Sequence, residues 1–93
     1  MGFKIDYSRD ACKFLETLPA KQFKQVANKI LKLVQNPLPS DAIKLKGDKE
    51  RFRTDIGEYR IVYSSHHSDN VIEIIVVGKR NDGEIYKKAN RKK

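Results

Sequence analysis

One segment constrains the fold more than any other, residues 51–78, because its apolar residues follow the spacing of β-strands. Residues 51–56 alternate between two faces, with Phe52 and Thr54 on one and Arg53 and Asp55 on the other, and residues 59–64 are largely apolar. The Gly-Glu pair between them predicts two antiparallel strands joined by a tight turn. A third strand is predicted at residues 70–78, which are almost continuously apolar. Such a run is typical of a central strand that is covered on at least one face. The second half of the chain therefore predicts a meander of three strands.

The first half of the chain predicts one short strand followed by two helices. Residues 3–7 alternate as in a half-buried strand, and Ser8 is placed to cap the helix that follows. An apolar stripe at helical spacing, ending before Pro19, predicts this helix: Ala11, Phe14, Leu15 and Leu18. A second stripe, ending at the Asn-Pro-Leu-Pro segment 36–39, predicts another: Phe23, Val26, Ala27, Ile30, Leu33 and Val34. The two helices form a hairpin that needs an apolar surface to pack on.

The order strand, helix, helix, meander predicts an α+β fold of two layers with about four strands. A chain of 93 residues supports one core, and hence a single domain over residues 1–93. The helix hairpin is expected to cover one face of the sheet and to leave the opposite face free. If Phe52 points to the core, Arg53 and Asp55 point to that free face, because successive strand residues alternate. A short segment after Asp82-Gly83, helix or strand, completes the predicted fold.

The charge balance is strongly basic. The chain has 20 Lys and Arg against 12 Asp and Glu, a formal net charge of +8, which attracts polyanions such as nucleic acid, acidic protein or anionic lipid. The single Cys12 excludes an internal disulfide. The longest apolar run, residues 74–77, is far shorter than the roughly 20 residues of a membrane helix, and no secretory signal pattern opens the chain. We therefore expect a cytoplasmic protein with no membrane partner.

Cations interrupt or follow the apolar runs of the predicted strands, and a tyrosine follows soon after the last of them: Arg53, Arg60, Lys79, Arg80 and Tyr86. Guanidinium and ammonium groups bind phosphate, and nearby cations favour the phenolate form of a tyrosine. The pattern therefore favours a phosphate ligand over a metal ion or a neutral small molecule. The adjacent His66 and His67 have no cysteine or carboxylate at ligand spacing around them, so we expect no metal and no other cofactor.

Three motifs carry a resemblance to a known family: KLKG at residues 44–47, RFRTDIGEYRIVY at 51–63 and VVGKRNDGEIY at 76–86. In this order, and in a chain of this length, they resemble the RelE/ParE superfamily of toxin–antitoxin toxins, and more closely its RelE-type ribonucleases. The resemblance spans nearly the whole chain, including the order of helices and strands. It therefore implies a single RelE-like toxin domain.

The resemblance implies ribosome-dependent cleavage of mRNA in the A site, in which the 2′-hydroxyl attacks the adjacent phosphate. By position, Arg60 matches the arginine that contacts the scissile phosphate. Arg53 and Arg80 match further basic positions of the catalytic site, and Tyr86 matches the tyrosine that transfers a proton. Several lysines would bind the RNA backbone: Lys44, Lys46, Lys79, Lys87 and Lys88. The implied partners are the ribosome with its mRNA, a cognate acidic antitoxin, and promoter DNA only through the antitoxin.

Asp55 departs from the family pattern, which often has a basic residue two positions after Arg53. On the same strand face as Arg53, its carboxylate subtracts positive charge from the site. Three interpretations are open. Asp55 is a general base, or it pairs with Arg53 or Arg60, or it marks a toxin whose site is weakened.

Two other functions are compatible with the sequence. One is ParE-like inhibition of DNA gyrase without any chemistry, against which Arg80 and Tyr86 argue, because a pure binder needs no proton-transfer group. The other is a catalytically weak relative that only binds RNA or the ribosome. The net charge alone suffices for that, since phosphate contacts give affinity without catalysis.

Overall fold

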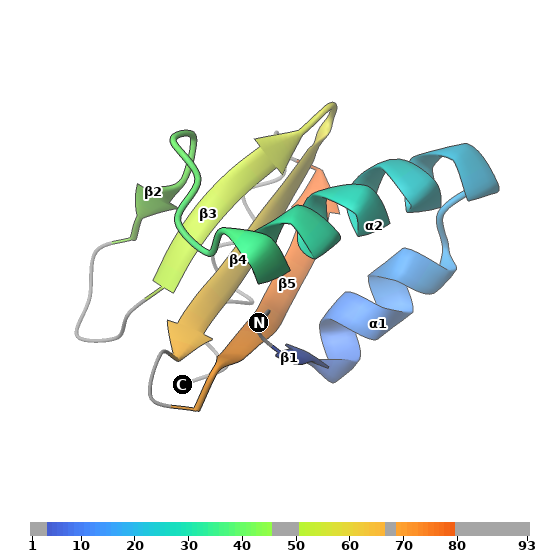
Figure 1. The fold of residues 1–93 in the computed structure, drawn as a ribbon. Coiled ribbons are helices and arrows are strands. Elements are labelled where there is room, and N and C mark those ends of the chain that lie inside the picture. The colour runs from blue at the N-terminus through green and yellow to red at the C-terminus, as the bar shows by residue number, and fades with distance from the viewer. Residues whose placement is uncertain (1–3, 46–50, 67–68, 80–93) are drawn as a thin grey trace.

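The computed structural model describes residues 4–45, 51–66 and 69–79, which form two helices and a five-stranded mixed sheet (Figure 1). In chain order these are β1 (Lys4–Tyr7), α1 (Arg9–Glu16), α2 (Ala20–Gln35), β2 (Ile43–Lys44), β3 (Arg51–Ile56), β4 (Tyr59–His66) and β5 (Val71–Lys79). The strands lie side by side in the order β1-β5-β4-β3-β2. Neither helix is long and apolar enough to cross a lipid bilayer, within the residues described.

The predicted α+β architecture is confirmed, and both helices lie on one face of the sheet. β3, β4 and β5 form the expected antiparallel meander. The sheet exceeds the expected four strands because the connector before β3 contains β2, which pairs antiparallel with β3. A strand of two residues is too short to show an alternating pattern. β1 pairs parallel with β5, from Lys4 beside Val71 to Tyr7 beside Ile74. The segment predicted after Asp82-Gly83 lies outside the described residues.

Ser8 caps α1, as its position in the sequence predicts. Its extended backbone allows the Oγ atom to accept a hydrogen bond of 3.0 Å from the Ala11 amide. The same hydroxyl donates to the carbonyl oxygen of Ile75 at 2.5 Å, and the Ser8 amide donates to Ile74. The N-cap residue of α1 thus also fixes the start of this helix to β5.

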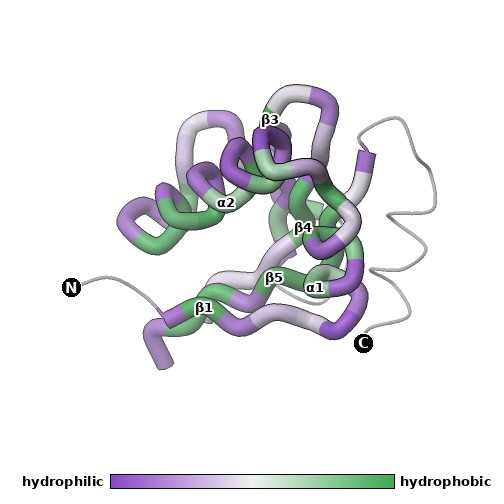
Figure 2. The backbone as a smooth tube through the Cα atoms, turned by 90° about the vertical axis from the view of Figure 1, so that its right-hand side faces the viewer, coloured by the Kyte–Doolittle hydropathy of each residue, from purple (hydrophilic) through white to green (hydrophobic). Residues whose placement is uncertain are grey.

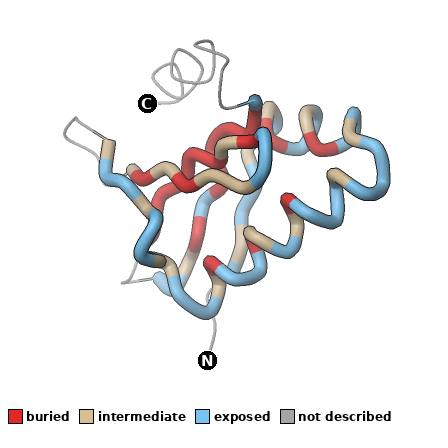
Figure 3. Tube along the Cα trace, turned by 90° about the horizontal axis from the view of Figure 1, so that it is seen from above, coloured by how far each residue is buried: buried red, intermediate tan, exposed pale blue. Residues whose placement is uncertain are grey.

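The main core lies between the helices and the sheet, and Figure 3 shows most of the buried residues on the strands. α2 contributes one buried stripe, and hydrophobic and hydrophilic residues alternate along it in Figure 2. Tyr59 and Tyr63 of β4 belong to it and are 7% and 0% exposed. The buried members of this core are Ala11, Leu15, Val26, Ile30, Leu33, Phe52, Tyr59, Ile61, Tyr63, Ile72, Ile74 and Val77.

A β-bulge in β5 buries residues on the other face as well. Val62 pairs with Val76 and Tyr63 pairs with Ile74, so Ile75 is an extra residue in the ladder. Ile75 and Val76 consequently join Val62 in a second buried cluster, against which Leu45 packs. The expectation that the face opposite the helices is free is therefore wrong over β4 and β5. The bulge also explains why β5 reads as continuously apolar.

Candidate nucleic-acid interface

The alternation of β3 separates its core residues from its charged ones. Phe52 and Thr54 are buried, at 9% and 1% exposure, and Phe52 belongs to the core beneath the helices. Arg51, Arg53 and Asp55 have the opposite parity and are partly buried. The sequence prediction that Arg53 and Asp55 share the face away from the helices is confirmed by this register.

The β3–β4 hairpin brings Arg60 to the same face. Asp55 lies directly across from Arg60, and Arg53 lies across from Val62. The strands are joined by the two-residue turn Gly57-Glu58, in which Gly57 has a φ of +57°. Glycine tolerates this left-handed conformation, and two-residue hairpin loops commonly require it.

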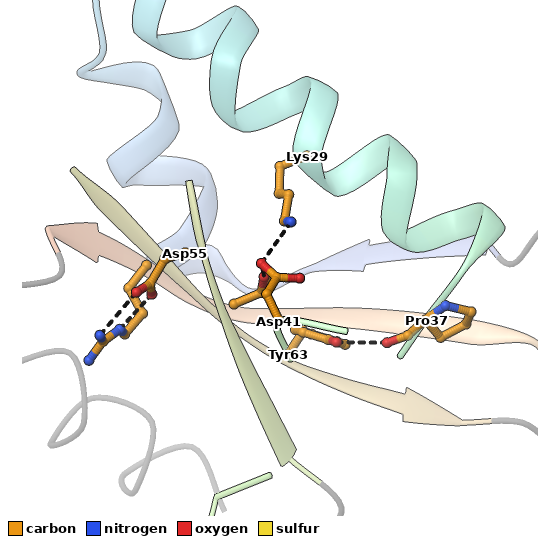
Figure 4. Close-up of polar contacts among 7 residues, drawn as sticks. Lys29, Pro37, Asp41, Asp55 and Tyr63 are labelled. Atoms are coloured by element: carbon orange, nitrogen blue, oxygen red, sulfur yellow. Dashed lines mark hydrogen bonds and ion pairs between the residues drawn. The ribbon is translucent and has the colours of Figure 1, made fainter. Parts of the chain in front are cut away.

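Asp55 and Arg60 form a two-point ion pair (Figure 4). Arg60 Nε donates to Asp55 Oδ1 at 2.8 Å, and Arg60 Nη2 donates to Asp55 Oδ2 at 3.2 Å. The side chain of Arg60 is 16% exposed and that of Asp55 is 33% exposed, so solvent screens the pair only in part. Of the three interpretations of Asp55, the structure contains the contact with Arg60. Its roles as a base or as a sign of weakened activity stay predictions.

Arg51 is a member of this face that the sequence reasoning did not single out. It lies two residues before Arg53 on β3, across from Ser64, and its Nε is shielded from solvent. Its odd position, shared with Arg53 and Asp55, was the signal that could have found it. We call these four residues the arginine face: Arg51, Arg53, Asp55 and Arg60. They carry three positive charges and one negative charge, beside the buried cluster of Val62 and Val76.

Two of the predicted RNA-binding lysines lie elsewhere. Lys44 of β2 pairs with Phe52, and Lys79 of β5 pairs with Tyr59, which are both core residues beneath the helices. The register thus gives both lysines the parity of the helix-covered face, where they are exposed at strand ends. The remaining predicted site residues lie outside the described part of the chain: Lys46, Arg80, Tyr86, Lys87 and Lys88.

A polar cluster behind β3 holds this strand to the helix layer (Figure 4). The hydroxyl of Thr54 donates to Asp41 Oδ2 at 2.7 Å, and Lys29 Nζ of α2 donates to the same oxygen at 3.0 Å. These bonds from Thr54 and Lys29 lower the pKa of Asp41. Thr54 lies between Arg53 and Asp55 on β3, so its bond supports their outward orientation. Asp41 was not predicted because it comes from a distant loop.

Tyr63 is not suited to proton transfer at neutral pH. Its hydroxyl donates to the carbonyl oxygen of Pro37 at 2.6 Å, and the side chain is buried. Burial, followed by the negative charge of Asp41, raises the pKa of Tyr63 to about 12. Its role is to fix the loop after α2 against the sheet.

An apolar pocket lies at a different place, beside β1 and the helices. It has a volume of about 290 Å³ and is lined by Tyr7, Cys12, Leu15, Glu16 and Phe23. Its lining carries no cation, so it does not fit a phosphate. Among residues 4–45, 51–66 and 69–79, no group of three or more His, Cys, Asp or Glu side chains is arranged to hold a metal ion.

Comparisons of the sequence give one family. The family profile of the ParE toxin of the type II toxin–antitoxin system parDE matches residues 5–83. A Methanocaldococcus jannaschii protein assigned as toxin RelE1 is 31% identical over 83 residues, which cover 86% of this chain and 92% of its own. The mRNA interferase toxin RelE of Escherichia coli K12 is 28% identical over 91 residues, which cover 96% and 95% of the two chains.

Solved structures of RelE toxins share the fold. A variant of E. coli toxin RelE in the free state has a TM-score of 0.82 and 24% identity, covering 99% of this chain and 98% of that chain. A chain of the RelE–RelB complex from Pyrococcus horikoshii has a TM-score of 0.74 and 24% identity, covering 89% and 100%. The profile match extends over most of the molecule, including the arginine face. The chain therefore belongs to the RelE/ParE superfamily of type II toxin–antitoxin toxins.

Proposed function

We propose that this toxin is an endoribonuclease that cleaves mRNA in the A site of the ribosome. The observation that carries the proposal is the arginine face, where Arg51, Arg53 and Arg60 lie together on two paired strands. Fixed guanidinium groups suit a phosphodiester, because they offer paired N–H donors and a permanent positive charge. Relatives named mRNA interferase, at 28% identity, support the same activity.

The proposed reaction is an internal transfer at one phosphate. The 2′-oxygen forms a bond to phosphorus and loses its proton, while the bond from phosphorus to the 5′-oxygen breaks and that oxygen gains a proton. The products are a 2′,3′-cyclic phosphate and a free 5′-hydroxyl. Negative charge gathers on the phosphoryl oxygens in the transition state, where Arg60, with Arg53 nearby, stabilises it.

The proton transfers are assigned to residues beyond the described part of the chain. Tyr86 exchanges the proton and Arg80 adds positive charge beside the phosphate, in line with the resemblance of residues 76–86 to the family motif. A positioned acid or base typically contributes about 10² to 10⁴ in rate. RNA supplies its own nucleophile, and the arginines supply the charge stabilisation, so the proposed reaction needs no metal ion.

The proposed partners follow from charge. The net charge of +8 favours the RNA backbone, with Lys44, Lys46, Lys79, Lys87 and Lys88 as contacts. A ribosome that holds the mRNA would align it for attack, and would put the site of action in the cytoplasm. A cognate acidic antitoxin would neutralise the toxin, as RelB binds RelE in the archaeal complex, and would link the pair to promoter DNA.

Primer extension on an mRNA held in a translating ribosome tests the proposal. We expect discrete A-site cuts with the natural protein and their loss with Arg60→Ala and with Arg80→Ala. Lys24→Ala is the matched control, because it removes one positive charge from the exposed surface of α2 and should leave the cuts unchanged.

Unchanged cleavage by Arg60→Ala would overturn the assignment of the arginine face. Absence of cuts with the natural protein would reject the nuclease. Inhibition of gyrase supercoiling in a parallel assay would then favour the ParE-like alternative, which the matching family profile keeps relevant. Ribosome binding that weakens with salt, without cuts, would favour the non-catalytic relative.

A further inference from the structure

We propose that Asp55 is a built-in brake on the phosphate site: its carboxylate occupies Arg60 in the free toxin, and an RNA phosphate binds Arg60 by displacing it. The inference rests on the proposed function, since it takes a phosphodiester as the ligand. It assigns to Asp55 a regulatory role that differs from that of a general base.

Asp55 binds Arg60 in the two-point geometry with which a guanidinium group also binds a phosphate. Asp55 binds Arg60 through Nε at 2.8 Å and Nη2 at 3.2 Å, which is one of the paired donor edges that guanidinium groups offer to phosphates. A phosphate that takes this edge with two hydrogen bonds needs the same N–H groups. Carboxylate and phosphate therefore compete for Arg60.

The position of Asp55 makes this competition part of the fold. Asp55 and Arg60 are five positions apart in the sequence, and the Gly57-Glu58 turn makes them direct neighbours across the β3–β4 ladder. The strand register holds the carboxylate next to the guanidinium group, whereas two long side chains on an exposed surface form ion pairs only transiently. At 16% exposure, Arg60 is also partly desolvated, which strengthens the attraction that a phosphate must replace.

Charge adds to the effect. Asp55 lowers the net charge of the arginine face from +3 to +2. After its displacement from Arg60, its carboxylate would still repel the phosphate. A phosphate that is held in place by other contacts can overcome this competition, whereas one on a loosely bound strand cannot. The brake therefore favours RNA that is already positioned, as on the ribosome, over free RNA.

The test measures binding of a short 2′-O-methyl RNA, which lacks the nucleophile and cannot be cleaved. Fluorescence anisotropy at several salt concentrations would compare the natural protein with Asp55→Asn, which removes the charge and retains the size. We expect Asp55→Asn to bind severalfold more tightly, and one additional phosphate contact to steepen the salt dependence by about 0.7 in log–log slope.

Two controls separate local competition from a general change of charge. Glu58→Gln removes one negative charge from an exposed residue of the same hairpin and should change affinity much less. In an Arg60→Ala background, Asp55→Asn should give no more than the gain seen with Glu58→Gln, because the competition requires Arg60. Asp55→Thr, which suits a strand, repeats the test if thermal melting shows that Asp55→Asn is poorly folded.

Unchanged or weaker binding by folded Asp55→Asn and Asp55→Thr would overturn the brake, as would an equal gain from Glu58→Gln. Absence of RNA binding by the natural protein and by Asp55→Asn at low salt would overturn it too. Ribosomal cleavage, assayed in parallel, reports on the proposed nuclease separately. A toxin that cuts mRNA but binds RNA no better after Asp55→Asn has the activity without the brake.

Discussion

Thr54 illustrates how a single buried residue prepares a surface on the opposite side of its strand. Its side chain is 1% exposed, and its hydroxyl donates to Asp41, which also accepts from Lys29. Because neighbouring residues of a strand point in opposite directions, holding Thr54 inward directs Arg53 and Asp55 outward. The hydrogen bond between Thr54 and Asp41 thus ties the loop after α2 to β3 and helps to orient the arginine face.

Replacing Thr54 with Val should destabilise the protein by about 1 kcal/mol at neutral pH, because a hydrogen bond to a carboxylate is lost at little change in volume. The value stays modest because Asp41 is 47% exposed and solvent screens it. Urea unfolding of both proteins would measure the difference. An unchanged free energy of unfolding at neutral pH would contradict a stabilising role for this bond.

The same pair of proteins should show a pH dependence of known sign. The pKa of Asp41 is lower in the folded state than its usual value of 3.8, so its ionised form stabilises the fold above that value. This contribution is lost as the pH falls through the folded pKa. The stability difference between the natural protein and Thr54→Val should therefore shrink below about pH 4. A difference that stays constant or grows in acid would contradict this assignment.

At the scale of elements, the β3–β4 hairpin does most to form the site. Its two-residue turn fixes the register, and this register alone makes Asp55 and Arg60 neighbours. Gly57, at a φ of +57°, lies close to α2: a Cβ atom there would be 2.8 Å from Gln25 Nε2. Because Gln25 is exposed and flexible, its end can move aside, and the left-handed conformation is the main reason for glycine in this turn.

Gly57→Ala should destabilise the protein by roughly 1–2 kcal/mol through its left-handed conformation, and the contact with the flexible end of Gln25 should add only a small second part. The double variant with Gln25→Ala should recover only the second part, because it removes the contact and not the backbone strain. Thermal or urea unfolding of the two variants would separate the contributions. Full recovery in the double variant would show that the backbone conformation costs little.

These elements also show which features a sequence can predict. The faces of Arg53 and Asp55 follow from strand alternation, and an ion pair with Arg60 was among the interpretations it allowed, because both are local patterns. The bulge at Ile75 could not be predicted, because a continuous apolar run does not indicate at which residue the strand alternation is interrupted. The contact of Asp41 with Thr54 joins segments 13 residues apart through a loop without periodicity. Periodic patterns thus predicted elements and faces, whereas pairings between distant segments required the structure.

At the scale of the whole molecule, basic residues lie on both layers. The arginine face lies on the side of the sheet away from the helices, and the exposed lysines of α2 lie on the helix layer. A net charge of +8 attracts RNA to any part of such a surface. Direct contact with a phosphate, in contrast, involves only the particular side chains that lie against the bound RNA.

Arg53→Gln and Lys24→Gln each lower the net charge by one, and so distinguish contact from overall attraction. We expect Arg53→Gln to weaken binding of 2′-O-methyl RNA and to reduce its salt dependence by about 0.7 in log–log slope, with little change for Lys24→Gln. Anisotropy titrations over a range of salt would measure both. Equal losses in the two variants would mean that net charge governs binding, regardless of face.

The parallel pairing of β1 with β5 has a consequence for the synthesis of the toxin. β1 is the first described strand to be made, yet Lys4 must wait for Val71 before its ladder can form. The carbonyl group of Ile75, which accepts a hydrogen bond from the Ser8 hydroxyl, is likewise made 67 residues after Ser8. Contacts between such distant residues form late and slowly. A nascent toxin therefore cannot complete its sheet until the residues of β5 have been made.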